Sequence, residues 1–175
     1  KRLQLWFESQ RTIQFSGDGN IKDGFRSPSV EFDLGYLMLH SFRHLMHEGL
    51  SLRQVMDYYF TLKDEHASEY YPQTMYALQQ FGIDKFAGAM IYVIQQVFGL
   101  KDEELLCKPD VKIGKRLLAE IEKTGTGKQD KGGKSNISSF YNHFGRQCNF
   151  FMDYPSEVLW SPIWKVWNFF WRKNN

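Results

Sequence analysis

Three histidines at helical spacing, His40, His44 and His47, are the residues of this chain whose types and positions first suggest chemistry. At about 100° per residue a helix projects them within roughly 60° of one another, so they share one face. Imidazoles placed in this way can converge on one metal ion, with Asp57 or Glu48 as a further ligand. The alternative is hydrogen bonding to a neighbouring helix. We favour hydrogen bonding and expect no metal site, because no carboxylate lies within the histidine pattern as it does in a zinc motif.

A second polar group follows at Arg53, Gln54 and Asp57. Arg53 precedes Asp57 by one helical turn, which is the less favourable order for an ion pair within one helix. This order favours separate partners, such as His44 for Asp57 and an acidic ligand for Arg53; an ordinary ion pair between the two is the alternative. No nucleophile with a base at motif spacing is present, so we assign no catalytic residue. The candidate binding residues are His40, His44, Arg53, Gln54, Asp57 and, in the preceding loop, Arg26.

These residues belong to a stretch from Phe32 to Leu62 that reads as two helices joined by a tight turn at residues 48–50. Gly49 suits the left-handed conformation that ends helices, and Ser51 suits the N-cap of the next helix. We expect an antiparallel helical hairpin. Its first helix buries apolar residues that recur at three- and four-residue spacing, namely Phe32, Leu34, Leu37, Met38, Phe42, Leu45 and Met46.

The rest of the chain is also mainly helical in pattern. Residues 11–15 alternate as a short strand would, and a turn follows at residues 17–20, so we expect a small β element within residues 11–25. Asp84 resembles an N-cap, and Gly88 suits close helix packing. The prediction is a mainly α, multi-helix single domain with further helices at residues 1–10, 72–81, 85–99, 111–124 and 137–152.

Composition narrows the class of protein. The chain has 175 residues, of which 42% are hydrophobic, which excludes intrinsic disorder. A net charge of +2 with no basic stripe argues against nucleic-acid binding. Two cysteines without metal spacing fit a reduced, cytoplasmic setting, and no apolar run is long enough to span a membrane. The start at Lys1, within an amphipathic pattern, suggests that a longer protein contains this chain.

Residues 125–135 are rich in glycine and lysine and contain no apolar residue, so we expect an exposed, flexible loop. A phosphate-binding P-loop needs glycine five positions before a Gly-Lys-Ser/Thr run. Gly133-Lys134-Ser135 supplies the end of that pattern, but Lys128 occupies the leading position. A surface loop is therefore the better interpretation.

The C-terminal segment from Glu157 onward contains four tryptophans and is apolar on nearly every side of the helix that its pattern predicts after Pro162. Tryptophans with Arg172 and Lys173 would suit the headgroup region of a membrane. Docking onto another part of the protein is the alternative, and we favour it.

Several short runs together resemble an uncharacterised bacterial nucleotidyltransferase family. They combine a helical His-x3-His pattern, a glycine and a Leu-Arg-Gln-x2-Asp pattern, with weaker echoes over most of the chain. The runs are Phe25-Arg26-Ser27-Pro28-Ser29, Glu31-Phe32, Leu37-Met38-Leu39-His40, Arg43-His44-Leu45, Glu48-Gly49, Leu52-Arg53-Gln54, Asp57, Phe86-Ala87, Phe98-Gly99-Leu100 and Tyr154-Pro155-Ser156-Glu157.

The resemblance implies the helical C-terminal portion of a nucleotidyltransferase similar to polymerase-beta-type enzymes. In that family an α/β core with paired aspartates holds Mg²⁺ and a nucleoside triphosphate. This chain lacks that core, so the resemblance implies an upstream core as partner, while the present residues line the nucleotide or acceptor cleft and are inactive alone. Lys128 is an outer candidate, although residues 124–128 depart from the family's glycine-rich segment. The alternative function is a non-catalytic helical module that docks a protein partner or a membrane through its aromatic C-terminus.

Overall fold

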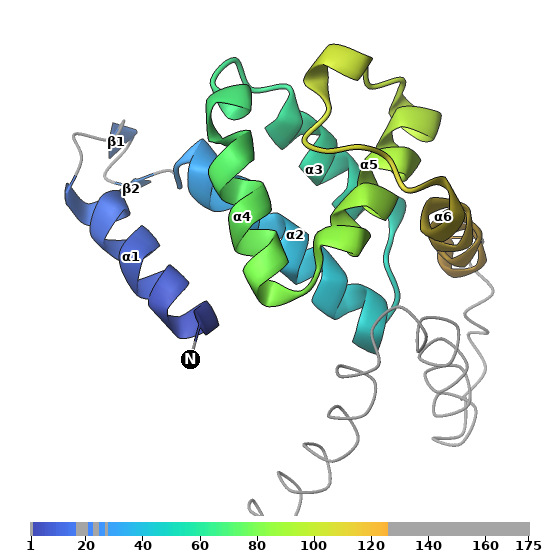
Figure 1. Ribbon diagram of the computed structural model, residues 1–175, viewed down its shortest axis with the longest axis horizontal. Helices are drawn as coiled ribbons and strands as arrows, with labels where there is room; N and C mark the ends of the chain where they lie inside the picture. The colour runs from blue at the N-terminus through green and yellow to red at the C-terminus, as the bar shows by residue number, and fades with distance from the viewer. Residues whose placement is uncertain (1, 17–20, 23–24, 27, 126–175) are drawn as a thin grey trace, which may run out of the picture. The chain divides into compact units, whose positions relative to one another are not determined.

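The computed structural model describes residues 2–16, 21–22, 25–26 and 28–125. The described chain confirms the predicted mainly α, multi-helix fold, whose helices Figure 1 shows in order from blue α1 to ochre α6. The elements are α1 (Arg2–Ser16), β1 (Ile21–Lys22), β2 (Phe25–Arg26), α2 (Val30–His47), α3 (Leu52–Leu62), η1 (Ala67–Tyr70), α4 (Tyr71–Phe81), α5 (Asp84–Phe98), η2 (Asp102–Glu104) and α6 (Val111–Gly125), where η denotes a 3-10 helix.

The chain divides into two compact units. The first contains Lys1–Leu45 and Gly49–Lys128, and the second contains Met46–Glu48 and Gln129–Asn175. The packing described below is that of the first unit. The predicted loop at 125–135, apart from its first residue, the predicted helix at 137–152 and the aromatic C-terminal segment lie outside the described residues.

The predicted pair of helices in residues 32–62 is present as α2 and α3. Gly49, with φ of 103°, occupies the left-handed region, and its N–H donates to the His44 carbonyl at 2.7 Å. Ser51 is the N-cap of α3, as its residue type predicts. The buried Tyr58 of α3 then donates its hydroxyl to the Leu34 carbonyl of α2 at 3.1 Å, which joins the two helices through their core faces.

Helix α5 supplies much of the core, with a continuous run of buried residues from Phe86 to Ile91. Gly88 permits a close approach, as predicted, but by the segment before α6 and not by a helix: a Cβ there would lie 3.2 Å from the Lys108 carbonyl oxygen. The Gly88 carbonyl accepts from the Asp110 N–H at 2.9 Å, and the Asp110 carboxylate accepts from the Ile113 N–H at 2.9 Å. Asp110 therefore both attaches to α5 and caps the start of α6.

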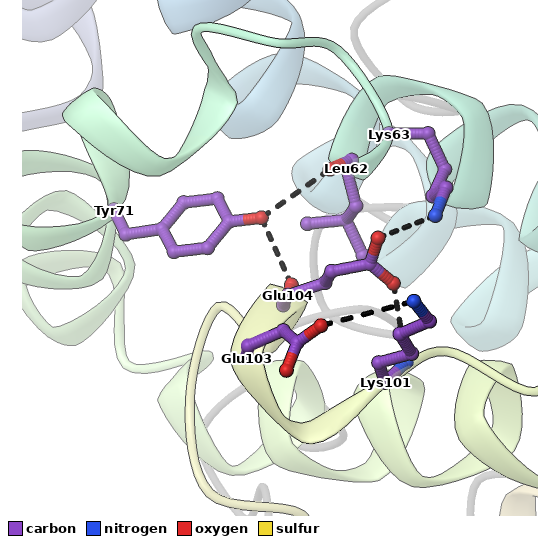
Figure 2. Close-up of polar contacts among 6 residues, drawn as sticks. All are labelled: Leu62, Lys63, Tyr71, Lys101, Glu103 and Glu104. Carbon is purple, nitrogen blue, oxygen red and sulfur yellow. Dashed lines mark hydrogen bonds and ion pairs between the residues drawn. The ribbon is translucent and has the colours of Figure 1, made fainter.

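A polar cluster joins the end of α3 to η2 (Figure 2). The Tyr71 hydroxyl donates to the Glu104 carbonyl at 2.9 Å and to the Leu62 carbonyl at 3.5 Å. The Glu104 carboxylate pairs with Lys63 and accepts from the Lys101 N–H at 3.1 Å. Burial, followed by the Glu104 charge, raises the pKa of Tyr71 to about 12, so its hydroxyl remains a donor at neutral pH.

Two local predictions were wrong. Residues 11–15 form the second half of α1 rather than a strand, and the small β element is confined to β1 and β2, where Ile21 pairs with Arg26 and Lys22 with Phe25. Five alternating residues are too few to outweigh continuation of a helix that tertiary contacts anchor at Trp6 and Gln10. Asp84 is the first residue of α5, and Ile83 occupies the N-cap position.

Candidate functional site

The face of α2 that carries the predicted histidines forms a row of rings at four-residue intervals. Phe32 stacks on Tyr36 with ring centroids 5.2 Å apart, and Tyr36 stacks on His40 at 5.7 Å. His40 and His44 then meet edge to face at 4.4 Å, with their Nε2 atoms 3.0 Å apart. A contact between two imidazole nitrogens is a hydrogen bond only when one carries a proton and the other accepts it. The distance therefore fits a hydrogen bond in which the Nε2–H of one ring donates to Nε2 of the other.

The third histidine, His47, is exposed at the end of α2. Within the described residues no three histidine, cysteine or carboxylate side chains come close enough to hold one metal ion. These residues therefore do not fit the Mg²⁺ that the family resemblance implies for the whole protein.

Arg53 and Asp57 are both exposed on α3. Neither side chain forms a hydrogen bond or ion pair with any residue that the structure describes, so neither the expected contact between Asp57 and His44 nor the alternative ion pair between Arg53 and Asp57 is present. Arg53 lies in the first turn of α3, which contains no acidic residue. The partial positive charge of a helix N-terminus disfavours a cation there and favours an anion.

Gln54 and Arg26 hold different positions. The Gln54 amide oxygen accepts from the Ser51 N–H at 2.9 Å and from its hydroxyl at 3.0 Å, so this residue contributes to the cap of α3. Arg26 lies in β2, opposite Ile21, and its side chain is outside the described part of the molecule.

A cavity of about 340 Å³ at α1, the start of α2 and α4 was not predicted from the sequence. Trp6 and Phe81 provide aromatic walls, and Gln10 and Glu31 contribute polar atoms. Gln10 is only 4% exposed and donates its amide N–H to the Glu31 carboxylate at 3.0 Å. Gln10 follows Trp6 by four residues and therefore lies on the same side of α1, which was a sign of the site in the sequence. Its partner Glu31, however, is 21 positions away.

Cys107 shows no sign of a catalytic thiol. It is half-buried and free of any disulfide. Burial, followed by the nearby charge of Asp84, raises the pKa of its thiol to about 11. A reactive cysteine requires a lowered pKa, whereas the thiol of Cys107 stays protonated at neutral pH.

Comparison with known proteins finds no matching family model, no matching curated protein and no matching solved structure. In the described part of the chain, none of the helices has both the length and the apolar character needed to cross a bilayer.

Proposed function

We propose that this chain is the helical portion of a nucleotidyltransferase and that α2 and α3 bind a nucleoside triphosphate or the acceptor. The exposure and position of Arg53 are the main support for this proposal. Its guanidinium is exposed, has no partner among the described residues, and lies in the first turn of a helix whose dipole disfavours a positive charge. A phosphate group would supply the missing negative charge and would accept two parallel hydrogen bonds from the guanidinium.

The pair formed by His40 and His44 supports an anionic ligand in the same region of the sequence. An imidazole N–H can donate a hydrogen bond to a phosphate or carboxylate oxygen. In this proposal the two histidines bind the ligand and have no catalytic role, and the exposed Asp57 accepts hydrogen bonds from a ligand hydroxyl.

The catalytic part of the reaction belongs to residues outside this chain. The proposal includes an upstream α/β core whose paired aspartates bind Mg²⁺, which stabilises charge on the transferred phosphoryl group when bound. It also includes a cytoplasmic setting, where nucleoside triphosphates are abundant. Extension of the reading frame upstream of Lys1 into a strand with paired aspartates would support the proposal, whereas a start codon close to Lys1 would contradict it.

Calorimetric titration of the full-length protein with each of the four nucleoside triphosphates and Mg²⁺ tests Arg53 directly. We expect Arg53→Ala to weaken binding at least tenfold, because a charge-assisted bidentate contact contributes about 1.5–3 kcal/mol. Arg11→Ala is the matched control, since Arg11 is also exposed but lies on α1. Equal affinities for the two variants, with unchanged circular dichroism, would remove Arg53 from the site.

A further inference from the structure

The outward face of α3 carries an apolar stripe. Leu52, Met56 and Phe60 follow one another at four-residue spacing, which places them on one side of the helix, and they are 40%, 38% and 62% exposed. The opposite side of α3, which includes Val55 and Tyr58, is buried in the core. A single exposed apolar side chain is ordinary, but three in successive turns of one helix form a patch that a monomeric protein seldom exposes. The stripe therefore indicates an interaction surface.

Aromatic rings extend this stripe from α3 to the end of α5. Phe60 meets Tyr59 edge to face, with ring centroids 5.5 Å apart, and Tyr59 stacks on Phe98 at 5.2 Å. Val97, the residue before Phe98, is 38% exposed. The contacts among the three rings lie within the chain, so this border of the stripe is formed before any partner binds.

Two opposite charges border the stripe on its other side. Arg53 and Asp57 each follow a residue of the stripe by one position, so each lies about 100° farther around the helix. Both are exposed, and neither side chain has a partner among the described residues. They remain unpaired although they are one turn apart, which agrees with the unfavourable order of a cation before an anion in a helix. Each charge can therefore pair with a partner molecule.

We propose that this face binds a second copy of the chain, with the two α3 helices antiparallel about a two-fold axis at Met56. Such an axis places Leu52 against Phe60 of the second copy, and Met56 against its own equivalent. The axis also brings the charged borders together in reversed order. At 1.5 Å per residue, Arg53 and Asp57 of the second copy then differ by about 3 Å in height along the helix, a distance that their side chains can span.

The charges favour a second copy over an unrelated protein. One face supplies both members of an ion pair, in the order that a two-fold axis requires, so two copies satisfy all four charges of the pair of faces. Arg53 also belongs to the proposed triphosphate site, where a bound triphosphate would compete with Asp57 of the second copy. The dimer is therefore measured without nucleotide, and a failure of either proposal leaves the other standing.

Sedimentation velocity of the full-length protein across a hundredfold range of concentration tests the dimer. We expect a reversible dimer in the parent. Met56→Lys places two ammonium groups against each other at the axis and should weaken the dimer at least tenfold. Tyr76→Lys, a change at an exposed side chain of α4, is the matched control and should leave it unchanged. A parent that stays monomeric at every concentration, or a dimer that Met56→Lys does not weaken, would overturn the proposal.

An exchange of charges tests the antiparallel arrangement. Arg53→Glu and Asp57→Arg each place like charges on the facing borders, so each variant alone should dimerise at least tenfold more weakly than the parent. An equimolar mixture of the two should dimerise more tightly than either variant, because an acidic border then faces a basic one. Both positions are exposed, and circular dichroism checks that both variants fold. A mixture that associates no more tightly than the separate variants would contradict the arrangement.

Discussion

At the scale of single residues, the described chain contains polar side chains of two kinds. Some complete the fold, such as Tyr58, whose buried hydroxyl bonds to α2, and Gln54, which bonds to the N-cap of α3. Others have an atom without a partner among the described residues, such as the exposed guanidinium of Arg53 and the buried Oε1 of Gln10. Side chains of the first kind are present because their hydrogen bonds stabilise the fold. The second kind includes Arg53, on which the proposed function rests.

Thr74 tests this distinction at a position with no proposed ligand. Its hydroxyl is buried on α4 and has no partner among the described residues. We expect Thr74→Val to raise the free energy of unfolding by about 1 kcal/mol, because it removes an unsatisfied polar atom at nearly constant volume. Thr74→Ser keeps the hydroxyl, loses a methyl group and should lower it by about 0.8 kcal/mol. Urea denaturation measures both, and a less stable Val variant would show that the hydroxyl has a partner.

At the scale of elements, helices α5 and α6 approach each other closely at Gly114. A Cβ at this position would meet Tyr92 Cδ1 at 2.4 Å and Tyr92 Cβ at 2.6 Å. The Cβ of Tyr92 is bonded to the backbone of α5, so rotation of the Tyr92 side chain does not move it away from a Cβ at residue 114. A Cβ at Gly35 would instead meet atoms in the ring of Trp6, the nearest at 2.5 Å, and a ring can tilt away.

We therefore expect Gly114→Ala to lower the free energy of unfolding by about 2 kcal/mol, as overpacking of a core does, even though alanine favours helix by about 1 kcal/mol. Gly35→Ala should lower the free energy of unfolding by less than Gly114→Ala does. Thermal and urea denaturation of the two variants compare these costs. A Gly114→Ala variant as stable as the parent would show that α5 and α6 lie farther apart than described.

The cluster between α3 and η2 has a pH dependence with a definite sign. The Lys63 ammonium, followed by the Lys101 N–H, lowers the pKa of Glu104 below its usual value of 4.5. A lowered pKa in the folded state means that the ionised carboxylate stabilises the fold above about pH 4.5, and that this contribution disappears as the pH falls through the folded-state pKa.

Glu104→Gln should therefore be less stable than the parent at pH 7, and the difference should vanish as the pH falls below 4.5. Glu103→Gln is the control, since the Glu103 side chain is 77% exposed and lies 3.8 Å from Lys101. Chemical denaturation from pH 3 to 7 measures the effect. A difference that grows as the pH falls would reverse the assigned sign.

At the scale of the whole molecule, the sequence predicted what depends on short-range patterns. Ser51 and Gly49 marked the ends of helices correctly because caps and left-handed turns depend on single residues. The strand predicted at residues 11–15 was wrong because contacts with distant residues decided the local structure. The cavity at Gln10 and Glu31 was missed for the same reason, since it joins residues that only the fold brings together. The nucleotidyltransferase assignment stays a prediction, as no comparison bears on it.

The proposed function requires that an anionic nucleotide binds along α2 and α3. NMR titration of the full-length protein with a nucleoside triphosphate, observing arginine Nε–H and histidine ring signals, measures this most directly. The proposal predicts shifts at Arg53, His40 and His44 that saturate at one affinity, with Arg11 on α1 unaffected. The absence of shifts at Arg53 and the histidine pair under saturating triphosphate would contradict the account.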